Sequence, residues 1–352
     1  MSGTSLPGRR AGPLGLLRVS PTNRGLLLLL ALLVALFGVL VGAPLFTAGS
    51  LRSMALQVPQ LGLLSLAMMV ALLSGGLDLS IIAVADFSAI VSGWLLTTWA
   101  PSHGAFAFVP QIGCLCVGLL VATAIGLLNG MVIAYLDVSP ILTTLGTMTM
   151  IKGLSIGLTH GGVISGFPPL VLFLGNASVA GIPVALIVLL LTALPVAVML
   201  NRSPFGNLVA MIGSNEPAVR YSGVDTRRVL VRIYMLSGFL AGLAGVIMMA
   251  RFNSANAAYG ESFLLVTVLA AVLGGVDPMG GFGKVSGLLI ALAILQLIST
   301  AFNLLGFSEF LTLTIWGATL VAVAGVTLLR RQLVFLLGLR SNARPPASRR
   351  SP

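Results

Sequence analysis

The chain has 352 residues, of which 57% are hydrophobic and only 8% are charged, with a formal net charge of +11. Soluble domains carry roughly 25% charged residues, so this composition excludes an ordinary globular protein and is typical of a multi-pass membrane protein. The basic residues flank apolar segments, as the positive-inside rule describes, so nucleic acid is not an expected partner and membrane lipid is.

The first 24 residues contain four arginines and no acidic residue, and they lead directly into an apolar run of about twenty residues. A secretory signal has a shorter apolar core and a small-residue cleavage site. We therefore expect residues 1–25 to be a basic cytoplasmic tail that precedes an uncleaved membrane helix.

Apolar segments long enough to cross a bilayer recur along the chain. A hydrocarbon core of roughly 30 Å needs about 20 helical residues. The predicted spans are 26–46, 55–74, 81–98, 108–134, 141–158, 181–200, 230–250, 262–276, 283–303 and 309–329. The short span 262–276 could be re-entrant, but without it the arginine-rich C-terminal tail would be exported, which the positive-inside rule disfavours.

The sequence thus predicts an all-α polytopic membrane protein of about ten transmembrane helices. Residues 26–329 would form one transmembrane domain, and residues 330–352 a basic tail on the cytoplasmic side, like the N-terminal tail. Glycines spaced four apart, such as Gly126/Gly130, Gly153/Gly157 and Gly238/Gly242, predict close helix packing inside this bundle rather than a dimer motif.

Two aspartates lie near the junction of the second and third spans, where Gly75 and Gly76 weaken the helix. A carboxylate inside a bilayer is costly, so such residues usually face a cavity or a partner. Asp78 could line a polar path at a broken helix, or it could cap the next helix from a short interfacial loop. Asp86 lies deeper in the third span, where a pathway or interhelical role is as plausible as a purely structural one.

Small hydrogen-bonding side chains follow in the fourth and fifth spans. Threonine hydroxyls often bond to their own helix, so most of them need no special role. The predicted translocation path consists of Asp78, Ser80, Asp86, Asn129, Thr143 and Thr144.

Residues 201–232 form a long polar stretch that carries five arginines between apolar spans. Its charge predicts a cytoplasmic location. Within it, Asn215 could cap a short helix with Pro217 in its first turn, and Gly223 could end that helix. A polar segment would then remain for a soluble partner to contact, namely Asp225, Arg227 and Arg228.

Motifs for nucleotide binding, hydrolysis and catalytic metal binding are absent from the sequence, so we expect neither an enzyme nor a resident cofactor or metal. Active transport would then draw energy from an ion gradient or from a separate ATPase. An ion-coupled secondary transporter would rely on Asp86 and Lys152. A permease driven by a partner needs a cytoplasmic surface helix, which residues 201–232 offer.

Several blocks resemble one family of transport proteins. GNLVAMIGSNEPAVRYSGVDTRRV (206–229) looks like the cytoplasmic loop of bacterial ribose-type sugar-importer permeases, which are membrane subunits of ABC transporters. Autoinducer-2 permeases belong to the same group, and branched-chain amino-acid permeases are more distant relatives. The resemblance extends to LSGGLDLS (73–80), NGMVIAYLDVSPILTTLGTM (129–148), LSGFLAGLAGVIMMAR (236–251) and VLAAVLGGVDPMGGFGKVSG (268–287).

The resemblance implies a permease of the vitamin B12-importer (type II) class in the bacterial inner membrane. Two permease subunits, identical or paralogous, would sit on two ATPase subunits that bind ATP, and would accept sugar from a periplasmic binding protein. Residues 201–229 would carry the coupling helix. The residues expected to take part in coupling are Gly206, Gly213, Asn215, Glu216, Ala218, Arg220, Gly223, Asp225, Arg227 and Arg228.

Overall fold

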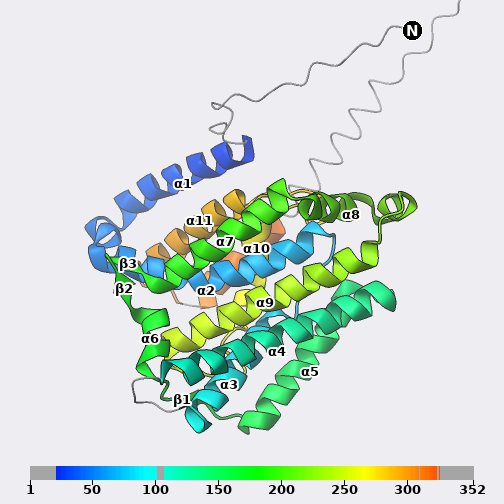
Figure 1. The fold of residues 1–352 in the computed structure, drawn as a ribbon. Helices are drawn as coiled ribbons and strands as arrows, with labels where there is room; N and C mark the ends of the chain where they lie inside the picture. Colours follow the sequence, from blue (N-terminus) through cyan, green and yellow to red (C-terminus); the bar gives the residue numbers. More distant parts are fainter. Residues whose placement is uncertain (1–20, 101–106, 309, 323–324, 326–352) are drawn as a thin grey trace, which may run out of the picture.

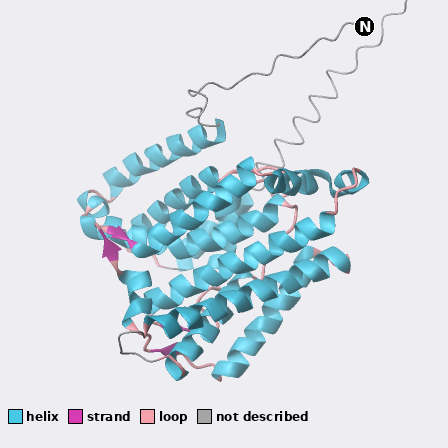
Figure 2. Cartoon of the chain, viewed as in Figure 1, coloured by secondary structure: helices cyan, strands magenta, loops and turns pink. Residues whose placement is uncertain are grey.

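The computed structural model describes residues 21–100, 107–308, 310–322 and 325. This part of the chain folds as a helical bundle, with four strands of two residues each (Figures 1 and 2). β1 (Ile164–Ser165) pairs antiparallel with β4 (Ser254–Ala255), and β2 (Ser178–Val179) pairs antiparallel with β3 (Ile182–Pro183). The predicted all-α class is confirmed.

Eight of the described helices are long and apolar enough to cross a membrane. They are α1 (Pro21–Leu40), α2 (Ala48–Leu73), α3 (Ile81–Thr98), α4 (Phe108–Tyr135), α5 (Pro140–Thr159), α7 (Val184–Arg202), α9 (Thr226–Phe252) and α11 (Val285–Leu304). Two shorter apolar helices, α10 (Phe263–Leu273) and the helix Phe310–Ala322, occupy the other two predicted spans. At 1.5 Å per residue, α10 is too short to cross a bilayer alone.

Three further helices connect these elements. They are the 3₁₀ helix η2 (Ala43–Phe46), α6 (Pro169–Asn176) and α8 (Pro204–Tyr221). α1 begins several residues earlier than predicted, at Pro21. The remainder of the N-terminal tail and the predicted C-terminal tail, 330–352, lie outside the described residues.

α2 lies at the centre of the bundle. Every side chain from Pro59 to Leu73 is buried, because α2 packs against α7, α9, α10 and α11. α9 lies beside it and packs most extensively on α4. A helix that is apolar on all sides is stable only inside such a bundle or a membrane, so the composition of α2 explains its place.

Glycines allow α4 and α9 to approach closely. A Cβ on Gly126 would lie 3.0 Å from the Cα of Gly238, and one on Gly238 would lie 2.9 Å from the Cα of Gly126. This contact confirms the predicted packing role for these glycines. The prediction is wrong for Gly153 and Gly157, because both face open space on α5.

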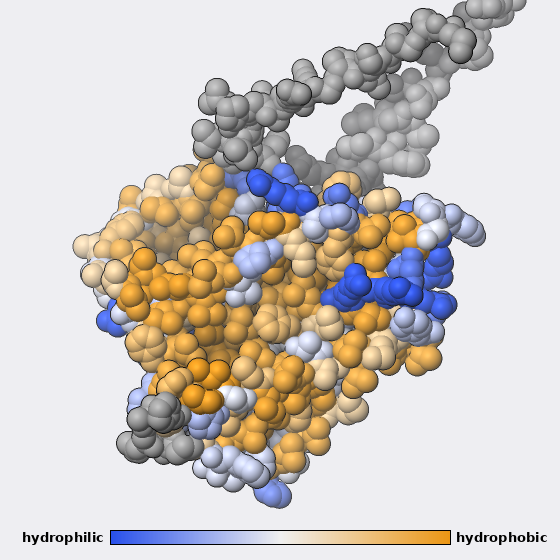
Figure 3. All heavy atoms as spheres, in the orientation of Figure 1, coloured by the Kyte–Doolittle hydropathy of each residue, from blue (hydrophilic) through white to orange (hydrophobic). Residues whose placement is uncertain are grey.

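The loops gather at two ends of the bundle. At one, called the α8 end, the turn at residues 74–80 meets α8 and the loop 274–284, since a Cβ on Gly75 would lie 3.6 Å from Gly213 O. The other, called the β1 end, holds β1, β4 and α6 (Figure 1). Hydrophobic side chains dominate the visible surface between them, while hydrophilic ones gather toward the α8 end (Figure 3).

Candidate functional site

An irregular buried turn joins α2 to α3. α2 ends at Leu73, and Gly75 follows with a φ of 82°, a conformation that glycine adopts without steric cost. α3 begins only at Ile81. Most of this turn is buried by protein, and buried backbone polar groups need hydrogen-bond partners, so the turn needs them inside the bundle.

Asp78 supplies those partners. Asp78 is 1% exposed, and its carboxylate accepts hydrogen bonds from Ser80 N at 3.1 Å, Ser80 Oγ at 2.6 Å and Ser237 Oγ at 2.7 Å. Ser80, not Asp78, occupies the N-cap position of α3. Asp78 is therefore not the N-cap residue of α3, but its carboxylate ties the turn both to the start of α3 and to α9.

The hydrogen bonds continue from this turn into α4 and α5. Asn129 Nδ2 donates to Ser80 Oγ at 2.9 Å, and Thr147 Oγ1 donates to Asn129 Oδ1 at 2.6 Å. We call Asp78, Ser80, Asn129, Thr147 and Ser237 the Asp78 network. It links α4, α5, α9 and the turn, and each bond crosses between elements or anchors the turn itself.

Two predicted threonines lie beside the Asp78 network without joining it. Thr144 Oγ1 donates to its own helix at Pro140 O (2.8 Å) and also lies 3.2 Å from Leu77 O of the turn. The buried Thr143 hydroxyl has no hydrogen-bond partner among the described residues. Thr144 therefore bonds to its own helix, as helical threonines often do, and its contact with Leu77 O also supports the turn.

Asp86 belongs to a different part of the molecule. It lies on α3, is 3% exposed, and accepts a hydrogen bond from Gly260 N at 3.2 Å. Glu261, the next residue, forms an ion pair with Lys152 of α5. The predicted path residues therefore separate into the Asp78 network with its threonines and a second group around Asp86.

α8 consists of two helical segments. Ser203 caps the first segment, with its Oγ accepting from Gly206 N at 3.2 Å. The helix breaks at Asn215, whose φ and ψ are −163° and 89°, and Asn215 Oδ1 accepts from Ala218 N at 3.0 Å. Gly223, with a φ of 83°, follows the second segment. The predicted short helix capped by Asn215 and terminated at Gly223 is present.

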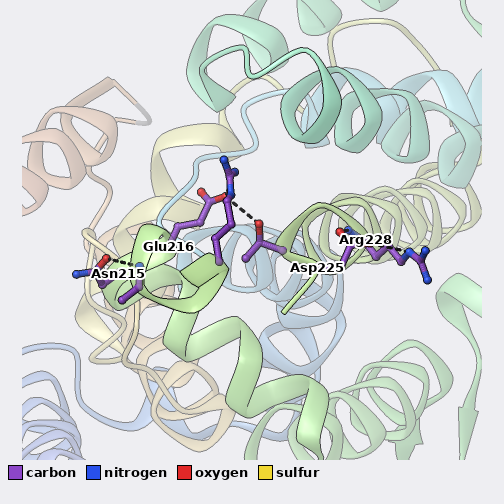
Figure 4. Close-up of polar contacts among 7 residues, drawn as sticks. Asn215, Glu216, Asp225 and Arg228 are labelled. Atoms are coloured by element: carbon purple, nitrogen blue, oxygen red, sulfur yellow. Dashed lines mark hydrogen bonds and ion pairs between the residues drawn. The ribbon is translucent and has the colours of Figure 1, made fainter. Parts of the chain in front are cut away.

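The polar residues of this region mostly contact one another (Figure 4). Arg220 Nη2 forms an ion pair with Glu216 Oε1 at 2.7 Å, and Thr226 Oγ1 donates to the same oxygen at 3.2 Å. Asp225 caps α9 through Arg228 N at 3.4 Å and pairs with the Arg228 side chain at 2.8 Å. In the first turn of α9, the Arg227 guanidinium lies over the Tyr135 ring, with its Cζ 5.7 Å from the ring centroid. These groups stabilise the segment from α8 to α9.

Four glycines bring three backbone segments into contact. Gly281 N donates to Leu73 O at 2.9 Å, and a Cβ on Gly213 would strike Leu73 O and lie 2.5 Å from Gly281 N. A Cβ on Gly280 would lie 2.6 Å from Gly75 N. We call Gly75, Gly213, Gly280 and Gly281 the glycine junction. It connects α8 directly to the turn that carries Asp78.

The outer surface of α8 is partly apolar. A groove runs between α8 and the loop that follows α10, with Met211, Ala218 and Phe282 in its wall. Tyr221 is 93% exposed and Phe282 is 70% exposed. Gly206, by contrast, is buried against Leu200 and contributes no surface.

A cavity that the sequence analysis missed lies toward the other end of α2. It has a volume of about 270 Å³ and lies between α2, the end of α9, α10, α11 and the helix Phe310–Ala322. Its polar lining includes Gln57, Gln60, Arg251 and Gln296, and its apolar lining includes Trp316. Three glutamines in otherwise apolar helices were the available signal, but Gln296 is far in sequence from Gln57 and Gln60.

Comparison with known proteins identifies the family. The family model described as "Branched-chain amino acid transport system / permease component" matches residues 50–324. The chain belongs to this permease family. It is also 34% identical over 298 residues to the ribose import permease protein RbsC of Bacillus subtilis (strain 168), covering 84% of this chain and 88% of the relative. No solved structure matches the chain.

Two other relatives of this permease come from Escherichia coli (strain K12). The D-allose transport system permease protein AlsC is 28% identical over 86% of this chain and 90% of its own length. The autoinducer 2 import system permease protein LsrD is 30% identical over 80% of this chain and 86% of its own length. The family match spans α2 to the helix Phe310–Ala322, so it includes the Asp78 network, α8 and the cavity, whereas α1 precedes it. Family membership and the apolar helices make the protein a multi-pass membrane permease with a transport role.

Proposed function

We propose that the chain is the membrane-spanning permease subunit of an ABC importer and forms the translocation path for a sugar or sugar-like solute. The similarity to permeases named for ribose, D-allose and autoinducer 2 import, over at least 80% of this chain in each case, supports this substrate class. A periplasmic binding protein would deliver the solute. The membrane would be the bacterial inner membrane, with both termini in the cytoplasm.

One observation carries the energy-coupling part of the proposal: α8 combines an exposed outer surface with a rigid inner contact. Its second segment begins at the Asn215 cap and presents Tyr221 and an apolar groove outward. Gly213, at the end of the first segment of α8, lies against the backbone where α2 enters the turn. An ATPase subunit docked on the outer surface would therefore move the turn with it.

The Asp78 network extends this path into the bundle. A shift of the turn would change the distances from Asp78 to Ser237 of α9 and from Ser80 to Asn129 of α4. These bonds are buried, so they hold the four elements in one arrangement until the turn moves. Alternating access requires such a link between the ATPase side and the helices around the solute.

A second permease subunit is also part of the proposal. α5 is mostly unburied, and Gly153 and Gly157 face open space on it. Glycines spaced four apart allow a helix of another subunit to approach closely. Reporter cysteines at these two positions would cross-link between subunits in membranes if α5 forms the contact.

Deletion of residues 214–223 tests the coupling role of α8. We expect the shortened protein to insert in the membrane but to lose co-purification with the ATPase subunit. The substitution Gly223→Val, which disfavours the φ of 83°, should weaken co-purification in the same direction. Gly113→Val, at a glycine facing open space on α4, is the matched control. Retained co-purification in the deletion variant would refute the assignment.

An ion-coupled secondary transporter is the alternative, and the group around Asp86 favours it. The buried Asp86 carboxylate and the Lys152–Glu261 ion pair place three ionisable side chains close to the 253–262 loop. This alternative predicts that a protonophore abolishes uptake while cellular ATP stays high. The proposed function predicts uptake that continues under those conditions and stops when ATP is depleted.

A further inference from the structure

The cavity beside α2 differs from ordinary packing defects because half of its lining residues are polar. Its walls carry three carboxamides, from Gln57, Gln60 and Gln296, and one guanidinium, from Arg251. Empty cavities in protein interiors are apolar, and polar cavities hold water or a ligand. Its volume of about 270 Å³ is close to the lower end of the roughly 300–1,000 Å³ range of small-molecule sites, which suits one small solute.

The hydrogen-bonding groups in this cavity are only partly used within the protein. Arg251 Nη1 donates to Gln60 Oε1 at 3.1 Å, and no carboxylate among the described residues forms an ion pair with Arg251. Gln296 Nε2 makes two long bonds, at 3.3 Å to Gln57 Oε1 and at 3.2 Å to Thr300 Oγ1. An arginine has five N–H donors and each carboxamide can both donate and accept, so donors and acceptors remain for a ligand.

The lining specifies the chemistry of that ligand. Carboxamides and the hydroxyls of Ser262, Ser299 and Thr312 complement hydroxyl groups, which also donate and accept hydrogen bonds. Trp316 adds an aromatic ring against which the C–H face of a sugar ring can pack. The lining contains no acidic residue, which disfavours a cation, and its neutral groups outnumber the single arginine, which favours a neutral solute over an acid.

We propose that this cavity is a binding site for a neutral sugar of monosaccharide size within a single permease subunit, held by Gln60, Gln296 and Arg251 against Trp316. This proposal rests on the proposed function. The lining residues of the cavity on α2, α10 and α11 lie in the halves of these helices nearest the β1 end, and Arg251 and Phe252 lie at the end of α9. This is the external side if α8 is cytoplasmic. The site would therefore receive solute before the helices around the Asp78 network move.

Thiol labelling tests the site without any transport step. In membranes containing the full chain with Cys114 and Cys116 replaced by alanine, Ser299→Cys places a thiol on the cavity wall. Asn303→Cys, on the exposed end of α11 outside the cavity lining, is the control. We expect a membrane-impermeant maleimide to label both. A panel of neutral pentoses and hexoses should slow labelling only at position 299, and D-glucuronate or choline should not.

Transport then tests the individual contacts. In proteoliposomes with the ATPase and binding protein, Gln60→Leu and Gln296→Leu should each reduce sugar uptake at least about tenfold, because each removes hydrogen bonds to the solute. Retention of the ATPase subunit at the wild-type level should show that both variants fold and assemble. Gln111→Leu removes a buried carboxamide of α4 outside this cavity and serves as the matched control.

The outcomes separate this inference from the proposed function. Unchanged sugar uptake in Gln60→Leu and Gln296→Leu, with no protection of the thiol at position 299, would overturn the site while leaving a sugar importer intact. Protection by D-glucuronate alone would overturn the neutral ligand class. ATP-driven uptake of a solute unrelated to sugars would instead overturn the proposed substrate class.

Discussion

The two ends of α2 have opposite surroundings although one apolar helix provides both. Near Gln57 and Gln60, side chains from four other elements leave a polar cavity of about 270 Å³. At Leu73, glycines bring backbones so close that no side chain fits between them. The cavity can accept a ligand and exchange one set of hydrogen bonds for another. The glycine junction has no space for local rearrangement, so its backbone segments move together.

This contrast suggests how the permease works as proposed. The helix between the two ends is buried from Pro59 to Leu73, and closely packed interiors transmit displacement rather than absorb it. A push on α8 would reach the turn through the glycine junction and the cavity through α2. The mechanism therefore predicts large effects from adding atoms at the junction and smaller effects from removing polar contacts elsewhere.

The largest effect is expected from Gly213→Ala. The new Cβ would strike Leu73 O and Gly281 N, both of which belong to backbone that cannot rotate away. We expect ATP-driven uptake to fall to background and the free energy of unfolding to fall by more than about 2 kcal/mol. Thermal unfolding in nanodiscs and uptake in proteoliposomes measure the two effects.

The control for Gly213→Ala is Gly113→Ala, at an exposed helical glycine that faces open space on α4. It should retain uptake, and its stability should stay the same or increase slightly, since alanine has the higher helix propensity. Wild-type uptake in Gly213→Ala would contradict a rigid connection between α8 and α2.

A smaller effect is expected at Asp78. Asp78→Ala removes the carboxylate that accepts from the Ser237 and Ser80 hydroxyls and leaves both buried without that acceptor. We expect the free energy of unfolding to fall by about 1–3 kcal/mol. Asp78→Asn keeps one oxygen acceptor and should lose less stability. Both variants should lower uptake, and Asp78→Ala should lower it more than Asp78→Asn. Equal stability of the two variants would show that the buried acceptors contribute nothing to holding the turn.

Much of this architecture could be predicted from local sequence signals. Each predicted span overlaps an apolar helix of the described residues, because length and hydropathy are local properties. The short helix after Asn215 was also predictable, since its cap, its first-turn proline and the terminating glycine lie within nine positions of one another. The chain itself encodes these features without tertiary contacts.

The contacts that join distant segments could not be predicted in this way. Ser237 lies 159 residues from Asp78, and Gln296 lies 239 residues from Gln57. A serine in an apolar helix commonly bonds to its own backbone, so nothing local distinguishes Ser237. The outward position of Gly153 and the inward position of Gly126 likewise depend on which helices pack together.

The smallest effect is expected from Arg228→Ala, on the first turn of α9. The Arg228 side chain is 74% exposed and pairs with Asp225 at 2.8 Å, and exposed pairs contribute at most about 1 kcal/mol and weaken with salt. We expect stability to change by less than about 0.5 kcal/mol and uptake to remain, because the glycine junction is untouched. Asp225→Ala should cost more, since it also removes the cap at Arg228 N. ATPase co-purification under rising salt is the deciding measurement. Loss of the ATPase in Arg228→Ala at unchanged stability would assign this arginine to the docking surface, and coupling would then depend on charge as well as on rigid backbone contact.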